Sequence, residues 1–152
     1  MSGYSDRLNS EIHERLDKLA EQGTPWIVRW ITHEIVNSHN SGLPDGEDGE
    51  FFQWTAYTTV CEEVRKIINK RAGDKPSEPA QQGQVTLPGF DREYMQDYYL
   101  VKRDGESVGM PVTELTDEEI EAKAQLYRKM GAACYAHADE LERFQHWRRS
   151  AA

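Results

Sequence analysis

Residues that could carry out chemistry are few in this sequence and lie far apart. The chain has five histidines and two cysteines, and only Cys134 and His137, in the stretch CYAH, lie about one helical turn apart as a pair of metal ligands would. A zinc site needs about four ligands, commonly in two such pairs, and Cys61 is the only other thiol in the chain. We therefore expect a buried thiol and a half-exposed imidazole here, with neither a metal nor another cofactor.

No catalytic motif accompanies these residues. His33 and Glu34 are adjacent, but the second histidine of a zinc-protease helix does not follow them. The sequence also lacks a nucleophile elbow, a phosphate-binding loop and a dinucleotide-binding fingerprint. Glu140 and Glu142 lie among cations late in the chain, a pattern typical of a solvated helix face. The sequence thus predicts a protein that is not an enzyme.

Basic residues gather in two places that a nucleic acid would contact. They are Arg65, Lys66, Lys70, Arg71, Lys102 and Arg103. The first four lie in the last turns of a predicted helix, where the helix dipole also favours cations. The formal net charge of the chain is −9, whereas proteins that bind the phosphate backbone usually present a broad basic face. DNA binding through these residues is therefore the alternative hypothesis, and binding to another protein is the leading one.

The composition of the chain indicates where in the cell the protein is expected. Charged residues make up 30% of the chain and hydrophobic residues 38%, and no apolar run reaches the length of a membrane span. The first residues, MSGYSDRLNSEIHERL, contain no apolar segment of a secretory signal. Two well-separated cysteines suit free thiols in a reducing compartment better than a disulfide. We expect a cytoplasmic protein that does not enter the membrane.

Hydrophobic periodicity predicts three helices before a polar linker at 73–83. Apolar residues recur at spacings of three and four in each helix. Thr24 and Pro25 predict the start of the second helix, because a hydroxyl cap followed by proline favours the first helical turn. The predicted ranges are 5–22, 25 to about 39, and 50–72.

The stretch VKRDGESVGMPV predicts a β-hairpin. Asp104 and Gly105 are favoured in a type I′ turn between two strands. Successive residues of a strand face opposite sides, so the side chains of Lys102 and Arg103 are expected to point in opposite directions. This alternation favours a hairpin that covers a core over a wing that reads a DNA groove.

The last predicted helix begins at a capping box formed by Thr116 and Glu119. Its apolar stripe continues to about Trp147, far beyond the usual helix length. Small and apolar residues at a spacing of seven predict a seam for a second helix. The residues expected to mediate self-association are Tyr127, Gly131, Cys134, Ala138 and Leu141.

These elements together predict a mostly helical α+β fold. Residues 1–115 are expected to form a domain of three helices and a β-hairpin, and residues 116–152 a long C-terminal helix that makes a homodimer possible. The order of elements loosely resembles a winged-helix domain followed by a dimerisation helix. However, the predicted connection between the second and third helices is longer than a helix-turn-helix allows.

Three stretches resemble small proteins encoded by bacteriophages and prophages. They are LPGFDREYMQDYYLVKRDGE, GMPVTELTDEE and YRKMGAACYAHADELERF. No single activity defines that group, so the resemblance implies no catalytic residue. It implies a bacterial or phage cytoplasm, where small acidic proteins often regulate or inhibit host machinery. The expected function is a regulatory or inhibitory module that binds another macromolecule, foremost a host or phage protein.

Overall fold

The computed structural model describes residues 3–39, 46–75 and 87–151, so most of the predicted linker lies outside the described residues. It has the mostly helical α+β fold that the sequence predicts, with two C-terminal helices in place of one. The elements in chain order are α1 (Tyr4–Glu21), α2 (Val28–Ser38), α3 (Glu47–Ala72), β1 (Tyr98–Arg103), β2 (Glu106–Pro111), a 3-10 turn (Val112–Glu114), α4 (Asp117–Met130), a second 3-10 turn (Ala132–Cys134) and α5 (Tyr135–Ala151).

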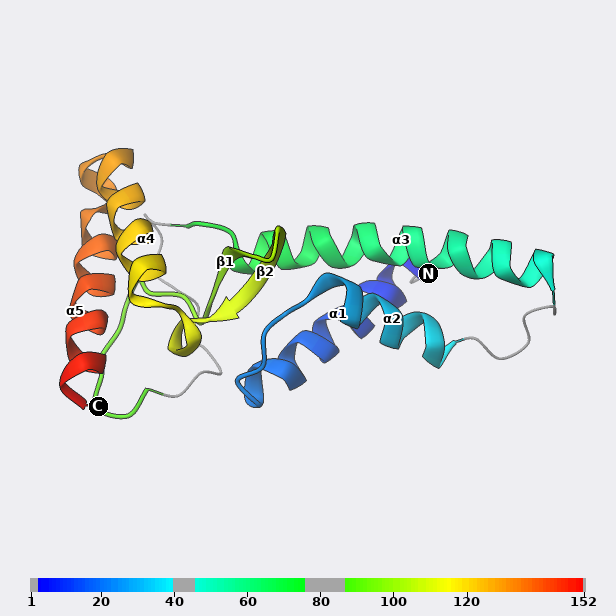
Figure 1. Ribbon diagram of the computed structural model, residues 1–152, viewed down its shortest axis with the longest axis horizontal. Helices are drawn as coiled ribbons and strands as arrows, with labels where there is room; N and C mark the ends of the chain where they lie inside the picture. The colour runs from blue at the N-terminus through cyan, green and yellow to red at the C-terminus, as the bar shows by residue number, and fades with distance from the viewer. Residues whose placement is uncertain (1–2, 40–45, 76–86, 152) are drawn as a thin grey trace.

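The molecule is elongated, with helices packed at both ends and the hairpin between them. Helices α1 and α2 lie along α3 at one end, and α4 and α5 form an antiparallel pair at the other end that runs across the direction of α3 (Figure 1). The start of α3 extends beyond the other elements (Figure 1). None of the helices in the described ranges combines the length and the hydrophobicity of a membrane-spanning segment.

Two separate cores fill the two ends. The first is made by α1, α2, α3 and one face of the hairpin; its buried residues are Ile12, Leu16, Ala20, Trp26, Ile31, Ile35, Val64, Ile67, Ile68, Ala72 and Tyr98. The second is made by the other face of the hairpin, the segment before it, α4 and α5; its buried residues are Phe90, Met95, Tyr99, Val108, Met110, Val112, Leu115, Ile120, Ala124, Tyr127, Cys134, Ala138, Leu141 and Phe144.

The hairpin separates these cores, because neighbouring residues of a strand face opposite sides. Tyr98 belongs to the first core and Tyr99 to the second. The turn has positive φ at both Asp104 (52°) and Gly105 (80°), as the predicted type I′ turn requires. Arg103 pairs with Glu106 across the turn. The predicted alternation is therefore confirmed, and both faces of the hairpin cover apolar residues.

The predicted start of the second helix at Pro25 is wrong, since α2 begins at Val28. The preceding segment is extended because Trp26 pairs with β2: its N–H donates to the Gly109 carbonyl at 2.7 Å, and the Gly109 N–H donates back at 3.0 Å. The Trp26 ring stacks on Tyr98 with ring centroids 3.7 Å apart. A side chain at Gly109 would meet Trp26 at 3.0 Å, so this close approach favours glycine.

The single long C-terminal helix is also wrong. The capping box of Thr116 and Glu119 is present, but α4 ends at Met130 and Gly131 adopts a φ of 121°, which favours glycine. The chain then turns back, and α5 packs against α4. The predicted self-association residues Tyr127, Cys134, Ala138 and Leu141 are buried in the second core, and Gly131 makes the turn. The apolar stripe is thus covered by its own chain, and it offers no seam to a second molecule.

Candidate functional site

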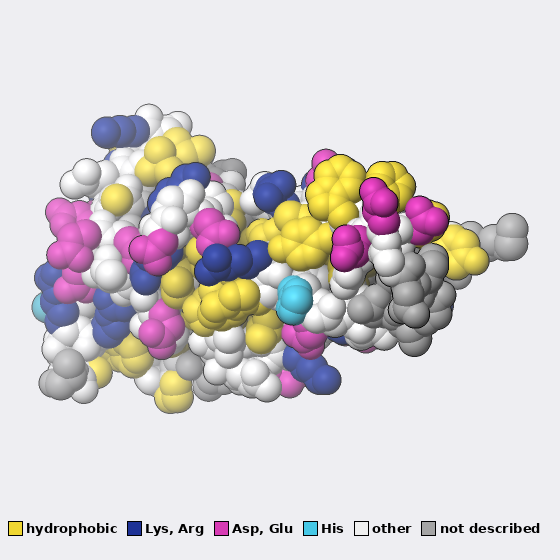
Figure 2. Space-filling view, turned by 45° about the vertical axis from the view of Figure 1, so that its right-hand side comes forward, with side chains coloured by type: hydrophobic (Ala, Val, Ile, Leu, Met, Phe, Trp, Pro, Cys, Tyr) yellow, Lys and Arg dark blue, Asp and Glu magenta, His cyan; other side chains and the backbone are white. Residues whose placement is uncertain are grey.

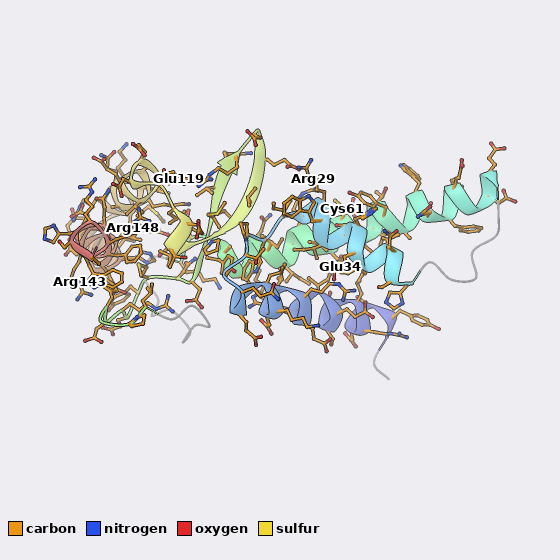
Figure 3. The ribbon with its side chains drawn as sticks, turned by 60° about the horizontal axis from the view of Figure 1, so that its bottom comes forward. Arg29, Glu34, Cys61, Glu119, Arg143 and Arg148 are labelled. Atoms are coloured by element: carbon orange, nitrogen blue, oxygen red, sulfur yellow. The ribbon has the colours of Figure 1, made fainter. Side chains whose placement is uncertain are left out.

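The candidate metal ligands are not assembled. Among the described residues, no group of three or more His, Cys, Asp or Glu side chains is placed to hold a metal ion. Cys134 is buried in the second core. Cys61 lies on α3, well separated along the molecule from the helix pair that carries Arg143 and Arg148 (Figure 3). The two thiols therefore belong to different ends of the protein.

His137 is fully buried rather than half-exposed as predicted. Its Nε2 lies 2.7 Å from the Tyr99 hydroxyl, and its ring lies 4.1 Å from the Tyr127 ring. Burial lowers the pKa of His137 to about 4. Because its side chain has no exposed surface, a substrate cannot reach it, and the Tyr99–His137 pair is a structural contact.

Glu140 is buried as well, which contradicts the solvated face predicted for it. Its carboxylate accepts backbone N–H groups of Glu93, Tyr94 and Met95 at 2.8 to 3.0 Å. Three such donors replace the hydration that a buried carboxylate loses. Glu142, in contrast, is exposed and pairs with Arg128 at 2.8 Å. Glu140 thus holds the segment before the hairpin against α5.

Two of the six candidate DNA-binding cations, Arg71 and Arg103, form ion pairs with a different secondary-structure element of the chain. Arg71 donates to Asp17 at 2.8 Å and lies over the Trp26 ring at 4.9 Å. Arg103 donates to Glu119 at 2.6 Å. Burial raises the pKa of Glu119, but the hydrogen bonds from Arg103 and Thr116 outweigh it, so this pKa lies below its usual value. These two guanidinium groups join secondary-structure elements.

The other four cations differ in their surroundings. Lys66 pairs with Glu63 at 3.1 Å, and Arg65 contacts the Cys61 sulfur at 3.7 Å. Lys70 and Lys102 are exposed and make no ion pair with any described residue. Lys102 points away from Arg103, since the hairpin alternates. The two predicted nucleic-acid contacts on the hairpin therefore lie on opposite faces.

The unusual surface of this protein is the first half of α3. Apart from Gly49, the buried residues of this helix all lie from Val64 onward. Phe51, Phe52 and Trp54 are 60%, 54% and 65% exposed, and the Phe51 ring lies 6.0 Å from the Phe52 ring and 6.4 Å from the Trp54 ring. We call these three residues the aromatic tip. Figure 2 shows hydrophobic side chains at this end of the molecule, with acidic side chains beside them.

An apolar groove of about 290 Å³ adjoins the aromatic tip. It lies between the start of α1, the end of α2 and the middle of α3. Its lining residues are Tyr4, Arg7, Leu8, Glu11, Ile35, Val36, His39, Ala56 and Val60. A second hollow of about 270 Å³ lies on the other side of α2 and includes Trp54 and Tyr57. Phe52 lies one helical turn before Ala56 of the groove, and Trp54 lines the second hollow, so residues of the aromatic tip flank both depressions.

Charged side chains lie at the start of α3 and along one side of the groove. The first turn of α3 carries Glu47, Asp48 and Glu50, which complement the positive end of the helix dipole. At the rim of the groove, Glu11 lies 2.8 Å from His39 and 3.9 Å from Arg7. An apolar centre with a polar rim is the usual composition of a protein–protein interface.

The sequence reasoning did not identify the aromatic tip. It assigned a core stripe to α3, of which the later half is buried and the earlier half is not. The buried members are Val64, Ile67 and Ile68, and the partly exposed members are Tyr57, Val60 and Cys61. The sequence feature that indicates this exposure is the position of Phe51 and Phe52, which lie outside the core stripe of the helix. Aromatic residues away from the core face of a helix are expected to be exposed, and exposed aromatics in a cluster indicate an interaction site.

Comparison of the chain with protein-family models, with curated protein sequences and with solved structures gave no match. The function of the chain is therefore inferred from the geometry of the described residues. Those residues include exposed aromatic side chains on α3 and no group of three or more His, Cys, Asp or Glu side chains placed to hold a metal ion.

Proposed function

We propose that this protein is a non-enzymatic module that acts by binding another polypeptide through the aromatic tip and the adjoining groove. The observation that carries the proposal is the exposure of three clustered aromatic side chains on the half of α3 where, among the described residues, only Gly49 is buried. A soluble monomer rarely leaves such a cluster in water, and large contiguous apolar patches mark interaction sites. Aromatic residues are also enriched in protein interfaces.

The regulatory or inhibitory role expected from the resemblance to phage and prophage proteins fits a module of this kind. A protein that works by occupying a surface of its target needs a rigid apolar patch and no reactive group. The patch here is built on a helix, and a helix presents its side chains with little loss of conformational entropy on binding.

No observation favours the alternative function of DNA binding. Arg71 and Arg103 neutralise carboxylates of their own chain at 2.8 and 2.6 Å. Both faces of the hairpin cover cores, so its strands have no free face for a DNA groove. A mobility-shift assay with mixed-sequence duplex at low salt is expected to show no complex. A strong, salt-sensitive shift would support the alternative.

The proposal is tested by affinity capture from a bacterial lysate with quantitative mass spectrometry. The wild type is compared with Trp54→Glu, which places a charge in the aromatic tip. The matched control is Met130→Glu, which changes a residue of similar exposure, 53%, at the opposite end of the molecule. We expect a captured polypeptide to be retained by the wild type and the control and lost with Trp54→Glu. Identical capture by all three proteins would refute the proposal, provided that their melting temperatures agree.

A further inference from the structure

One side of α3 is exposed from its first turn to beyond its middle. The residues on this side recur at spacings of three and four, and they fall within about 80° of the helix circumference. All of them are exposed. We call them the outer stripe; they are Glu47, Phe51, Trp54, Thr58 and Glu62.

The centre of the outer stripe is apolar. The rings of Phe51 and Trp54 lie 6.4 Å apart. The Thr58 hydroxyl donates to the Trp54 carbonyl at 3.0 Å, and the Thr55 hydroxyl donates to the Phe51 carbonyl at 2.9 Å. Because these hydroxyls are satisfied within the helix, a partner can pack on the two rings without supplying hydrogen bonds beside them.

The ends of the outer stripe are acidic. Residues 46–64 contain no lysine, arginine or histidine, and their acids are Glu47, Asp48, Glu50, Glu62 and Glu63. The helix dipole favours acids in the first turn, but it does not account for Glu62 in the middle of the helix. Neither Glu47 nor Glu62 forms an ion pair with a described residue. Figure 2 shows acidic side chains beside the hydrophobic ones at this end of the molecule.

The aromatic rings of the tip are also open to a cation. Within the described ranges, the arginines of this chain lie over rings elsewhere, with the guanidinium carbon 4.9 to 5.8 Å from the ring centre. Those rings are Trp26, Phe90, Tyr135 and Phe144. No described arginine or lysine lies over a ring of the aromatic tip. An exposed tryptophan face attracts a lysine or arginine side chain, so Trp54 can receive one from a partner.

We infer that the polypeptide bound at the aromatic tip presents a basic amphipathic segment. Its apolar side chains pack on Phe51 and Trp54, and its lysine or arginine side chains meet Glu47 and Glu62. These two carboxylates are 15 positions apart, about 22 Å along the helix, so a partner helix of about four turns reaches both. This inference rests on the proposed function and names the chemistry of its partner.

The same charges decide against other occupants. A nucleic acid or an anionic membrane surface would bring negative charge against a stretch that has acids and no cations. A neutral apolar segment would leave Glu47 and Glu62 beside it without an opposite charge. A basic segment is the partner whose charge complements this face.

The test is binding of labelled synthetic peptides to the full chain, followed by fluorescence anisotropy. The peptides are amphipathic, about 18 residues long, which as a helix spans the outer stripe. They share a leucine face and carry lysine, glutamine or glutamate at the other positions. The wild type is expected to bind the lysine peptide, more weakly as salt is added, and to bind the glutamate peptide at least about 10-fold more weakly than the lysine peptide.

Charge reversal on the protein locates the site. Glu47→Lys combined with Glu62→Lys is expected to weaken binding of the lysine peptide about 10-fold or more at low salt and to strengthen binding of the glutamate peptide. The matched control is Glu118→Lys combined with Glu121→Lys on α4. It changes the net charge by the same amount at exposed positions, and Glu118 lies in the first turn of its helix as Glu47 does. The control is expected to bind as the wild type does, and circular dichroism checks that both variants keep their helices.

Three results would overturn the inference: no binding of the lysine peptide, equal binding of the lysine and glutamate peptides, or an equal loss in the charge-reversed protein and its control. If the glutamine peptide binds as tightly as the lysine peptide and Trp54→Ala abolishes both, the proposed function stands and a basic partner is excluded.

Two other occupants give outcomes of their own. Binding to vesicles of anionic phospholipid that is lost with Trp54→Ala would identify a membrane surface instead. Sedimentation equilibrium of the chain alone reports on a second copy, and a dimer that is lost on reversal of Glu47 and Glu62 would show that this chain is its own partner. Either result would overturn the inference.

Discussion

Protonation of His137 is expected to destabilise the fold at acid pH. The side chain is 0% exposed, and its Nδ1 has no hydrogen-bond partner among the described residues. The Tyr99 hydroxyl accepts the Gln96 backbone N–H at 2.9 Å, which leaves its own hydrogen for His137 Nε2 at 2.7 Å. A second ring proton would thus displace a hydrogen bond and place a charge in the second core.

The size of the effect follows from the two pKa values. Burial lowers the pKa of His137 from 6.5 to about 4, although the carboxylates of Glu140 and Asp74 act in the opposite direction. Between these values the unfolded chain binds a proton that the folded protein does not. The contribution of neutral His137 to the free energy of unfolding is therefore fully present above pH 6.5, and it is lost as the pH falls toward 4. At 1.36 kcal/mol per pH unit, the loss is about 3 kcal/mol.

The assay is urea unfolding at pH 7 and at about pH 4. His137→Gln is the informative variant, since glutamine accepts a hydrogen bond from Tyr99 but does not titrate. His146→Gln on the same helix is the control, because His146 is exposed. The wild type and the control are expected to lose about 3 kcal/mol more than His137→Gln between the two pH values. Equal losses for all three proteins would refute the reasoning, since carboxylates alone would then explain the acid sensitivity.

Three further predictions concern stability and use the same urea assay. Gly109→Ala should cost about 1 to 3 kcal/mol, because the new methyl group meets a tryptophan side chain at 3.0 Å; a neutral result would show that this contact relaxes freely. Glu140→Gln should cost about 2 to 3 kcal/mol through loss of charge-assisted bonds to three backbone N–H groups, whereas Glu142→Gln should change little. Arg103→Ala should cost about 1 kcal/mol through its ion pair, and the neighbouring Lys102→Ala almost nothing; equal effects would contradict the alternation of the hairpin.

Local patterns in the sequence were sufficient for most of the secondary structure. The sequence predicts the type I′ turn, with positive φ at Asp104 and Gly105, and the capping box of Thr116 and Glu119. Each of these features depends on residues only a few positions apart. The class of fold and the opposite directions of Lys102 and Arg103 follow from the same short-range rules. Such interactions are encoded in a single stretch of chain, so they can be read without knowing the rest.

Contacts between distant segments decided the remainder. The extended backbone at Trp26 depends on pairing with Gly109, and the burial of Glu140 depends on backbone donors at 93–95. Gly131 is tolerated inside a helix and also permits a turn, and only the packing of α5 on α4 selects the turn. The exposure of the aromatic tip was decided in the same way, because α1 and α2 bury mainly the second half of α3. A periodic pattern shows which residues can be buried, but the elements that cover them are set by the tertiary structure.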